Sequence, residues 1–126
     1  MFSDALNADS CNQLYPKALA NIPTIQSCLS TNSGPLPTFN GEFIDRELGI
    51  FPEWLLDKYL QLQLTTAENN MLNKVFATIK HACLTQPMVG MHRDYHSRNL
   101  MLLENNEIGV IDFQDAVVGP ITYDAV

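Results

Sequence analysis

A short run of side chains between residues 90 and 115 has types and spacing that suit phosphoryl transfer. His92, Asp94 and Asn99 reproduce the histidine, aspartate and asparagine of a phosphotransferase catalytic loop, in which the asparagine follows the aspartate by five positions. Such a reaction needs a carboxylate near the acceptor hydroxyl and oxygen ligands for Mg²⁺. We therefore predict Asp94 as the catalytic base and Asn99 with Asp112 as the magnesium ligands.

The other polar side chains of this run allow more than one interpretation. His92 is expected to brace the loop by hydrogen bonding, because Asp94 already fills the role of base. His96 and Arg98 either face the phosphates or are solvated loop residues. A rival hypothesis is a metal-dependent hydrolase, because the two histidines and the aspartate between them could ligate zinc or iron. That alternative leaves the asparagine and the second apolar run unexplained.

The elements that position this run are predicted from the hydrophobic pattern. Residues 88–91 indicate a short buried strand that ends where the loop starts. Two apolar runs, at residues 100–103 and 108–113, flank four polar residues and indicate a β-hairpin. A hairpin would bring Asn99 back beside Asp112, so that both oxygen ligands would lie together.

The N-terminal segment, residues 9–29, has apolar residues at helical spacing. Pro16 and Pro23 interrupt it. Because a proline deep in a helix removes a hydrogen bond and kinks the chain, we predict a short or broken helix pair. Residues 31–41 are turn-forming almost throughout, which predicts an ordered loop.

The middle of the chain is predicted to contain two helical stretches. From residue 42 an apolar stripe indicates buried core, and Pro52 indicates that the helix kinks or restarts there. Thr65 and Glu68 match a capping box, which predicts an amphipathic helix over residues 66–84. The stripe of the first stretch consists of Ile44, Leu48, Phe51, Leu55, Tyr59 and Leu62.

Composition limits the class of partner. The chain of 126 residues has the size of one domain, and its 46% of hydrophobic residues are enough to build a core. A formal net charge of -7 argues against a broad attraction to nucleic acid or to anionic lipid. We therefore expect a small-molecule partner.

Cysteine usage and hydropathy indicate the compartment. Cys11, Cys28 and Cys83 are odd in number and lack C-x-x-C spacing, which predicts reduced, buried thiols rather than disulfides or a zinc site. No apolar run approaches the roughly 18 residues that span a bilayer, and the N-terminus lacks the pattern of a secretory signal. We therefore expect a cytoplasmic protein.

Three stretches of the sequence, residues 91–101, 108–116 and 119–124, resemble the aminoglycoside phosphotransferase and choline kinase family. That family has a protein-kinase-like fold. The catalytic loop and residues 46–54 are most similar to its bacterial anomeric kinases. These enzymes use ATP to phosphorylate the C1 hydroxyl of N-acetylmuramate and N-acetylglucosamine in peptidoglycan recycling.

The resemblance implies ATP and Mg²⁺ as the cofactors of the reaction. It implies Asp94 as catalytic base, and Asn99 and Asp112 as the ligands of the metal and hence of the bound nucleotide. It further implies that Asp124 is a structural acid that braces the catalytic loop.

Four residues are candidates for contacts with the sugar: Arg46, Glu47, Trp54 and Asp115. For the first two the alternative is a salt bridge on a helix face, and for Trp54 it is a place in the core. Aminoglycoside antibiotics are less favoured as acceptors than cell-wall sugars, although an acidic surface would suit a cationic drug. The catalytic loop alone does not separate these acceptors.

The resemblance also indicates what residues 1–126 lack. Family members place a small β-rich lobe ahead of this region, with a glycine-rich loop and a strand lysine paired to a helix glutamate. Here the six glycines are scattered, and the lysines lie in helix-like or loop-like sequence. We therefore expect an α+β fragment of the larger, C-terminal lobe, mostly helical, without the small lobe and the terminal helices.

A fragment of this kind is expected to bind ATP weakly, to be inactive alone and to expose apolar surface that favours self-association. The alternative is a non-catalytic binding or regulatory module that uses the sugar pocket without chemistry. Asp94, Asn99 and Asp112 argue for catalytic ancestry, and they do not decide between these two outcomes.

Overall fold

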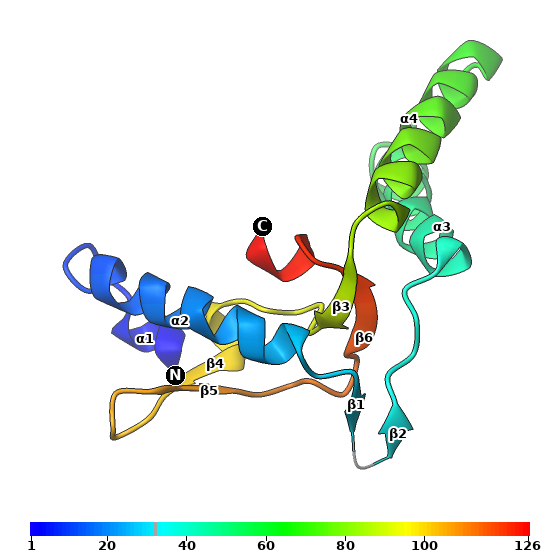
Figure 1. Cartoon of the computed structure of the whole chain (residues 1–126). Helices are drawn as coiled ribbons and strands as arrows, with labels where there is room; N and C mark the ends of the chain where they lie inside the picture. The colour runs from blue at the N-terminus through cyan, green and yellow to red at the C-terminus, as the bar shows by residue number, and fades with distance from the viewer. Residues whose placement is uncertain (32) are drawn as a thin grey trace. The chain divides into compact units, whose positions relative to one another are not determined.

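The computed structural model describes residues 1–31 and 33–126, which divide into two compact units (Figure 1). The first unit comprises Met1–Thr38 together with Pro87–Val126, and the second comprises Phe39–Gln86. The strands that the structure describes all lie in the first unit, and the second is helical. The chain therefore combines helices with small antiparallel sheets, in agreement with the predicted α+β class.

The core of the first unit forms where the N-terminal helices meet a β-hairpin (Figure 1). The helices are α1 (Phe2–Ala5) and α2 (Cys11–Gln26), and the hairpin strands are β4 (Leu100–Leu102) and β5 (Ile108–Val110). One buried apolar cluster joins these elements, and its members are Phe2, Leu14, Ala18 and Leu100. This cluster supports the hairpin that carries two of the predicted site residues at its ends.

Helix α2 runs without a break through Pro16 and Pro23, so the prediction of a short or broken helix pair is wrong. A proline in a helix interior typically costs about 3 kcal/mol. Both prolines lie on the exposed side, and Leu14, Ala18 and Ile22 form one buried face along the helix. Burial of that face offsets the lost backbone hydrogen bonds, since tertiary packing supplies most of the stability of protein helices.

The predicted strand before the loop is confirmed as β3 (Met88–Met91). It pairs antiparallel with β6 (Val117–Pro120), a partner that the hydrophobic pattern did not indicate. A further pair, β1 (Ser30–Thr31) and β2 (Gly34–Pro35), forms a small hairpin within the segment predicted as a loop. Residue 32 of that segment lies outside the described residues.

The predicted hairpin after the loop is also confirmed. β4 and β5 are antiparallel, with Leu100 opposite Val110, and both are shorter than the apolar runs that predicted them. Just beyond the last pair, the backbone N–H of Ile111 donates to the carbonyl oxygen of Asn99 at 3.0 Å. The hairpin therefore places Asn99 across from the residue that precedes Asp112.

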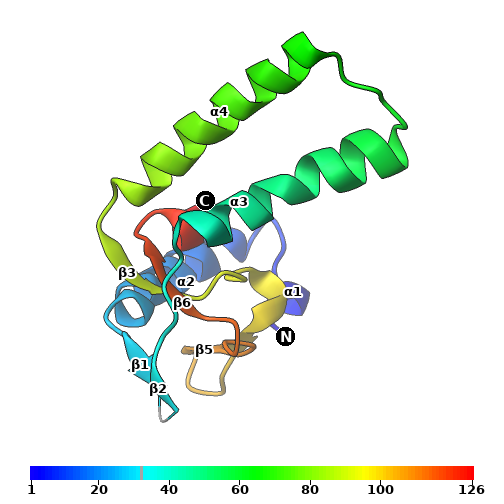
Figure 2. The ribbon, with the colours of Figure 1, turned by 90° about the vertical axis from the view of Figure 1, so that its right-hand side faces the viewer.

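The second unit is a helical hairpin (Figure 2). It consists of α3 (Gly41–Ile50), the π-helix η1 (Phe51–Tyr59) and α4 (Thr66–Leu84), which runs back along the opposite direction. Pro52 lies in the first turn of η1, as predicted for a restarted helix. An ion pair of 2.6 Å between Lys80 Nζ and a carboxylate oxygen of Asp45 joins α4 to α3.

Helix α4 has the predicted bounds, and its capping box is confirmed. The Thr65 hydroxyl accepts from the backbone N–H of Glu68, whose carboxylate accepts from the backbone N–H of Thr65 at 2.7 Å. The hydroxyl and backbone donors of Thr65 hold the pKa of the Glu68 carboxyl below its usual value of 4.5. The N-terminus of α4 thus favours the charged form of the Glu68 carboxyl.

The prediction that the apolar stripe of the second unit is buried core is wrong for most of its length. Ile44 is buried, but Phe51, Leu55, Tyr59 and Leu62 are exposed. A hairpin of helices covers only the faces that its members turn toward each other, so the outward apolar residues stay in solvent. Several large apolar side chains of this unit are therefore exposed.

Two further predictions concern the burial of the cysteines and the presence of membrane-spanning helices. Cys11, Cys28 and Cys83 are free thiols as predicted, but they are not buried, because Cys28 is exposed and the other two are partly exposed. Among residues 1–31 and 33–126, no helix combines the length and the apolar character needed to cross a membrane.

Candidate functional site

The loop that follows β3 is held by one acidic side chain. Asp124, in the short 3₁₀ turn η3 (Tyr123–Ala125), accepts a hydrogen bond from the backbone N–H of His92 at 2.7 Å. Its second carboxylate oxygen accepts from the backbone N–H of Arg93 at 3.0 Å. Arg93 has a left-handed φ of 78°, which a residue with a side chain adopts only at a cost. The two hydrogen bonds that Asp124 accepts help to hold the chain in this conformation.

The ring of His92 links the loop to the end of the hairpin. The residue is 2% exposed, Nε2 lies 3.0 Å from the carbonyl oxygen of Ile111, and Nδ1 accepts from the backbone N–H of Asp94 at 3.3 Å. A neutral ring with its proton on Nε2 satisfies both contacts. His92 thus lies between the loop and the strand that precedes Asp112.

The carboxylate of Asp94 is exposed, and in the described part of the chain it has no hydrogen-bond partner. Its backbone is fixed instead. The carbonyl oxygen of Asp94 accepts from the backbone N–H of His96 and from the side-chain amide of Asn99, both at 3.0 Å. A rigid loop therefore presents an unengaged carboxylate to solvent, where it can accept a proton from a bound molecule.

Asn99 ends the 3₁₀ turn η2 (Ser97–Asn99) immediately before β4. Its amide nitrogen donates to the carbonyl oxygen of Asp94, which leaves the amide oxygen as an acceptor. Asp112 lies after β5 with a left-handed φ of 67° and an exposed side chain. One of its carboxylate oxygens accepts from the side-chain amide of Gln114 at 2.6 Å.

The oxygens of Asn99 and Asp112 fit a magnesium ion. An amide oxygen and a carboxylate oxygen are hard donors, and protein sites for Mg²⁺ typically supply one or two carboxylates while water and substrate phosphates complete the shell. The hairpin brings the two residues to adjacent ends of β4 and β5. One carboxylate oxygen of Asp112 has no partner in the part of the chain that the structure describes.

Three further predicted residues lie around this group. His96 and Arg98 are exposed, and the ring of His96 accepts from the backbone N–H of Arg98 at 3.3 Å. Asp115 is exposed, and its carbonyl oxygen accepts from the Arg93 guanidinium at 3.4 Å. The structure thus brings these residues to the same unit as Asp94. Their roles remain predictions.

The geometry does not favour the transition-metal alternative. Both ring nitrogens of His92 are engaged within the protein, and Nδ1 of His96 already accepts from the backbone of its own turn. Among the residues described, no three histidine, cysteine, aspartate or glutamate side chains gather as a metal-binding group.

The remaining candidates for sugar contacts lie in the second unit. Arg46 stacks over the ring of Phe43 at 5.3 Å. Trp54 is 57% exposed, with the Lys58 ammonium 3.9 Å from its ring centroid, so the reading of a core tryptophan is wrong. Glu47 is partly exposed on α3. A role for these side chains in sugar binding stays a prediction.

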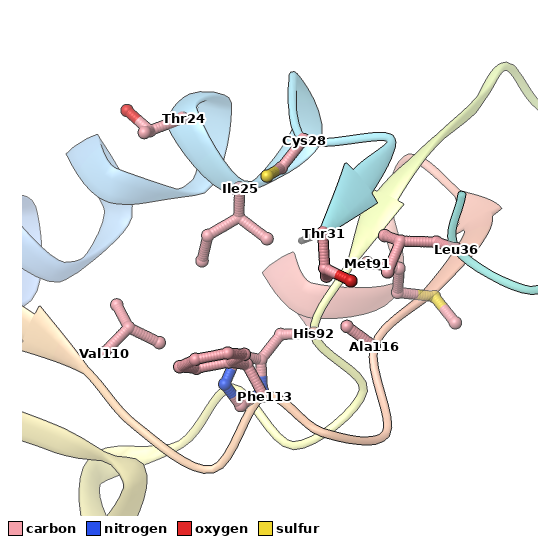
Figure 3. A pocket seen from close by; sticks show the side chains of 10 residues that line it. All are labelled: Thr24, Ile25, Cys28, Thr31, Leu36, Met91, His92, Val110, Phe113 and Ala116. Carbon is pink, nitrogen blue, oxygen red and sulfur yellow. The ribbon is translucent and has the colours of Figure 1, made fainter. Parts of the chain in front are cut away.

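An apolar cavity of about 310 Å³ adjoins His92 in the first unit (Figure 3). In Figure 3, the side chain of Ile25 points from α2 into the cavity, and that of Phe113 lines the opposite side. The lining does not include Asp94, Asn99 or Asp112. Phosphates and sugar hydroxyls need polar partners, so this cavity is not suited to the reacting groups.

Two residues near the site were not found by sequence reasoning. One is Gln114, whose bond to Asp112 depends on the backbone turn after β5. The other is Tyr95, whose hydroxyl donates to the carbonyl oxygen of Ala18 at 2.6 Å and so ties the loop to α2. The position of Tyr95 next to the predicted catalytic aspartate was the available signal for it, and no periodicity indicated Gln114.

Tyr95 gives the first unit an expected pH dependence. Burial raises the pKa of its hydroxyl above the usual value of 10.0, and the charge of Asp124 raises it further. A raised pKa means that the folded state favours the neutral form, so this stabilisation is complete below pH 10 and declines as pH rises through the folded pKa.

The measurement is the free energy of unfolding of wild type and Tyr95→Phe at pH 7 and between pH 10 and 11.5. At pH 7 the variant should be less stable by about 1 kcal/mol, because it loses one hydrogen bond. The difference in free energy of unfolding between wild type and Tyr95→Phe should become smaller at alkaline pH. Tyr59→Phe, at a position 78% exposed, is the control. A gap that stays constant with pH would contradict the assignment.

Comparison with known proteins gives consistent matches. The sequence matches the family model described as "Phosphotransferase enzyme family" over residues 4–126. An N-acetylmuramate/N-acetylglucosamine kinase of Pseudomonas putida is 38% identical over 123 residues, which are 98% of this chain and 35% of that protein. Kinases of the same name from Pseudomonas aeruginosa and Neisseria meningitidis are 37% and 41% identical over 98% and 90% of this chain. The chain spans about a third of the length of these curated relatives.

Proposed function

This chain belongs to the phosphotransferase enzyme family, and we propose that it supplies the base and the metal ligands of a kinase acting on an amino sugar. One observation carries the proposal. The Asp94 carboxylate is unengaged on a loop whose backbone is fixed by Asp124, His92 and Asn99. The family match supports the reaction class, and this geometry supports Asp94 as the residue that receives the proton.

In the proposed reaction, a sugar hydroxyl attacks the γ-phosphorus of ATP, and Asp94 accepts the hydroxyl proton while ADP leaves. General-base assistance of this kind typically contributes about 10²- to 10⁴-fold in rate. Asn99 and Asp112 would hold Mg²⁺, which when bound neutralises charge on the phosphate oxygens. Arg98 and His96 are placed in the same loop and are proposed to face the phosphates.

The proposed acceptors are N-acetylmuramate and N-acetylglucosamine, phosphorylated at the C1 hydroxyl. The support is that relatives named as kinases of these two sugars are 37–41% identical to this chain over 90–98% of its length. Arg46, Glu47, Trp54 and Asp115 are proposed to contribute to sugar recognition. We propose that the activity serves peptidoglycan recycling and that the protein is cytoplasmic.

We further propose that residues 1–126 are part of the larger, C-terminal lobe of the kinase. The span of about a third of the relatives' length supports this, as do the mixed helices and hairpin around the loop. A polypeptide of residues 1–126 alone is then expected to bind ATP weakly and not to turn over. Its exposed apolar residues, such as Trp54 and Tyr59, are proposed to favour self-association.

The test is a chimaera of the Pseudomonas putida relative in which the aligned segment is replaced by this chain. ATP consumption is measured with N-acetylmuramate, N-acetylglucosamine, choline and kanamycin as acceptors. The proposal predicts turnover with the two amino sugars and little with the others. Turnover restricted to choline or kanamycin, or none from a folded chimaera, would overturn it.

A further inference from the structure

Gln114 makes a short contact with a proposed metal ligand. Its side-chain amide donates to one carboxylate oxygen of Asp112 at 2.6 Å, two positions along the chain. Gln114 is itself exposed, so the contact is not a by-product of core packing. In the described part of the chain, Gln114 has no other side-chain hydrogen bond.

The backbone before Asp112 is fixed by hydrogen bonds. Without the bond from Gln114, the side chain of Asp112 would be free to rotate. The N–H of Ile111 donates to the carbonyl oxygen of Asn99, and the carbonyl oxygen of Ile111 contacts the ring of His92. Asp112 then turns through a left-handed φ of 67° into solvent. An exposed aspartate keeps its rotamer freedom, and ordering it for a metal costs free energy.

The bond from Gln114 reduces that cost. With one carboxylate oxygen occupied by the amide, the other is left as the acceptor that can meet a cation. Residues that hydrogen-bond to metal ligands orient them, and replacing such a residue typically costs about 10- to 100-fold in metal affinity.

We propose that Gln114 is a positioning residue that orients Asp112 to bind a divalent cation through one oxygen. The inference rests on the proposed function, because it takes Asp112 as a metal ligand. It goes further in assigning the orientation of that ligand to a residue outside the histidine, aspartate and asparagine motif.

The experiment uses the 126-residue chain labelled with ¹⁵N and titrated with Mn²⁺, a paramagnetic substitute for Mg²⁺ that reports weak binding. The readout is the broadening of the backbone amide of Asp112 and of the side-chain amide of Asn99, with reversal by excess Mg²⁺. Gln114→Leu is expected to need about tenfold more Mn²⁺ for the same broadening. The thermal midpoint should stay unchanged, because the replaced side chain is exposed.

Two further variants separate the inference from its premise. Asp112→Asn should abolish the selective broadening, and Gln63→Leu, at another exposed glutamine, should leave it unchanged. If Asp112→Asn has no effect, Asp112 is not a metal ligand, and the premise fails together with the inference. If Asp112→Asn abolishes broadening while Gln114→Leu binds Mn²⁺ like wild type, the role of Gln114 alone is overturned.

Discussion

Replacing Asp94 with asparagine is expected to lower the kcat of the chimaeric kinase by about 10²- to 10⁴-fold. Asparagine keeps the size of the side chain but cannot accept the hydroxyl proton. The carbonyl oxygen of Asp94 holds His96 and Asn99, and this backbone role survives the substitution. The KM for ATP should therefore change by less than about threefold, since the lost interaction acts in the transition state.

The measurement is steady-state kinetics of wild-type and variant chimaeras with the preferred amino sugar. Glu104→Gln is the matched control, because it removes an exposed carboxylate from the turn between β4 and β5, outside the loop that carries Asp94. It should retain full activity. A kcat for Asp94→Asn within about tenfold of wild type would mean that Asp94 is not the general base.

Alanine at Gly90 is expected to destabilise the first unit by about 1–3 kcal/mol. A Cβ at this position would overlap the carbonyl oxygens of Ile25 and Cys28 at the end of α2. Both atoms belong to the backbone, so the clash can be relieved only by moving β3 away from the helix. That movement would also shift the start of the catalytic loop, which begins two residues later with His92.

Gly109→Ala is the matched control, since Gly109 also lies in a strand of the first unit. The nearest atoms to a Cβ there belong to the flexible side chain of Leu103, at 3.4 Å or more. The free energy of unfolding from urea denaturation should fall sharply for Gly90→Ala and change by less than about 1 kcal/mol for Gly109→Ala. Equal effects of the two substitutions would contradict the close approach of β3 and α2.

Local signals predicted the elements around the site well. The capping box of Thr65 and Glu68 gave the start of α4, because caps specify where a helix starts. Two apolar runs separated by four polar residues predicted the hairpin and the approach of Asn99 to the strand end before Asp112. These features depend on residues close together in the sequence.

Features that depend on distant residues were not predicted. The pairing of β3 with β6 joins segments almost thirty residues apart, and no local pattern specifies it. Helix α2 continues through Pro16 and Pro23. Its buried face of Leu14, Ala18 and Ile22 packs in the core, which helix propensity alone does not reveal. In the second unit, the periodic stripe gave the helices but not their burial, because periodicity indicates an apolar face without indicating what covers it.

For the candidate site, the motif supplied the predicted residues but not their contacts. The spacing of His92, Asp94 and Asn99 identified the loop, while the hydrogen bond from Gln114 to Asp112 arises from the left-handed turn after β5. The hydrogen bonds that the Asp124 carboxylate accepts from the backbone N–H groups of His92 and Arg93 are consistent with the bracing that the family resemblance implied. Their effect on catalysis stays a prediction.

The most direct test of the central claim is ³¹P NMR of the product that the chimaera forms from ATP and N-acetylmuramate. We expect a sugar phosphate whose phosphorus couples to the anomeric proton, formed by the wild-type segment and formed about 10²- to 10⁴-fold more slowly with Asp94→Asn. Phosphorylation at another hydroxyl would contradict the proposed acceptor position. Product formed equally well by Asp94→Asn would contradict the claim that this loop supplies the catalytic base.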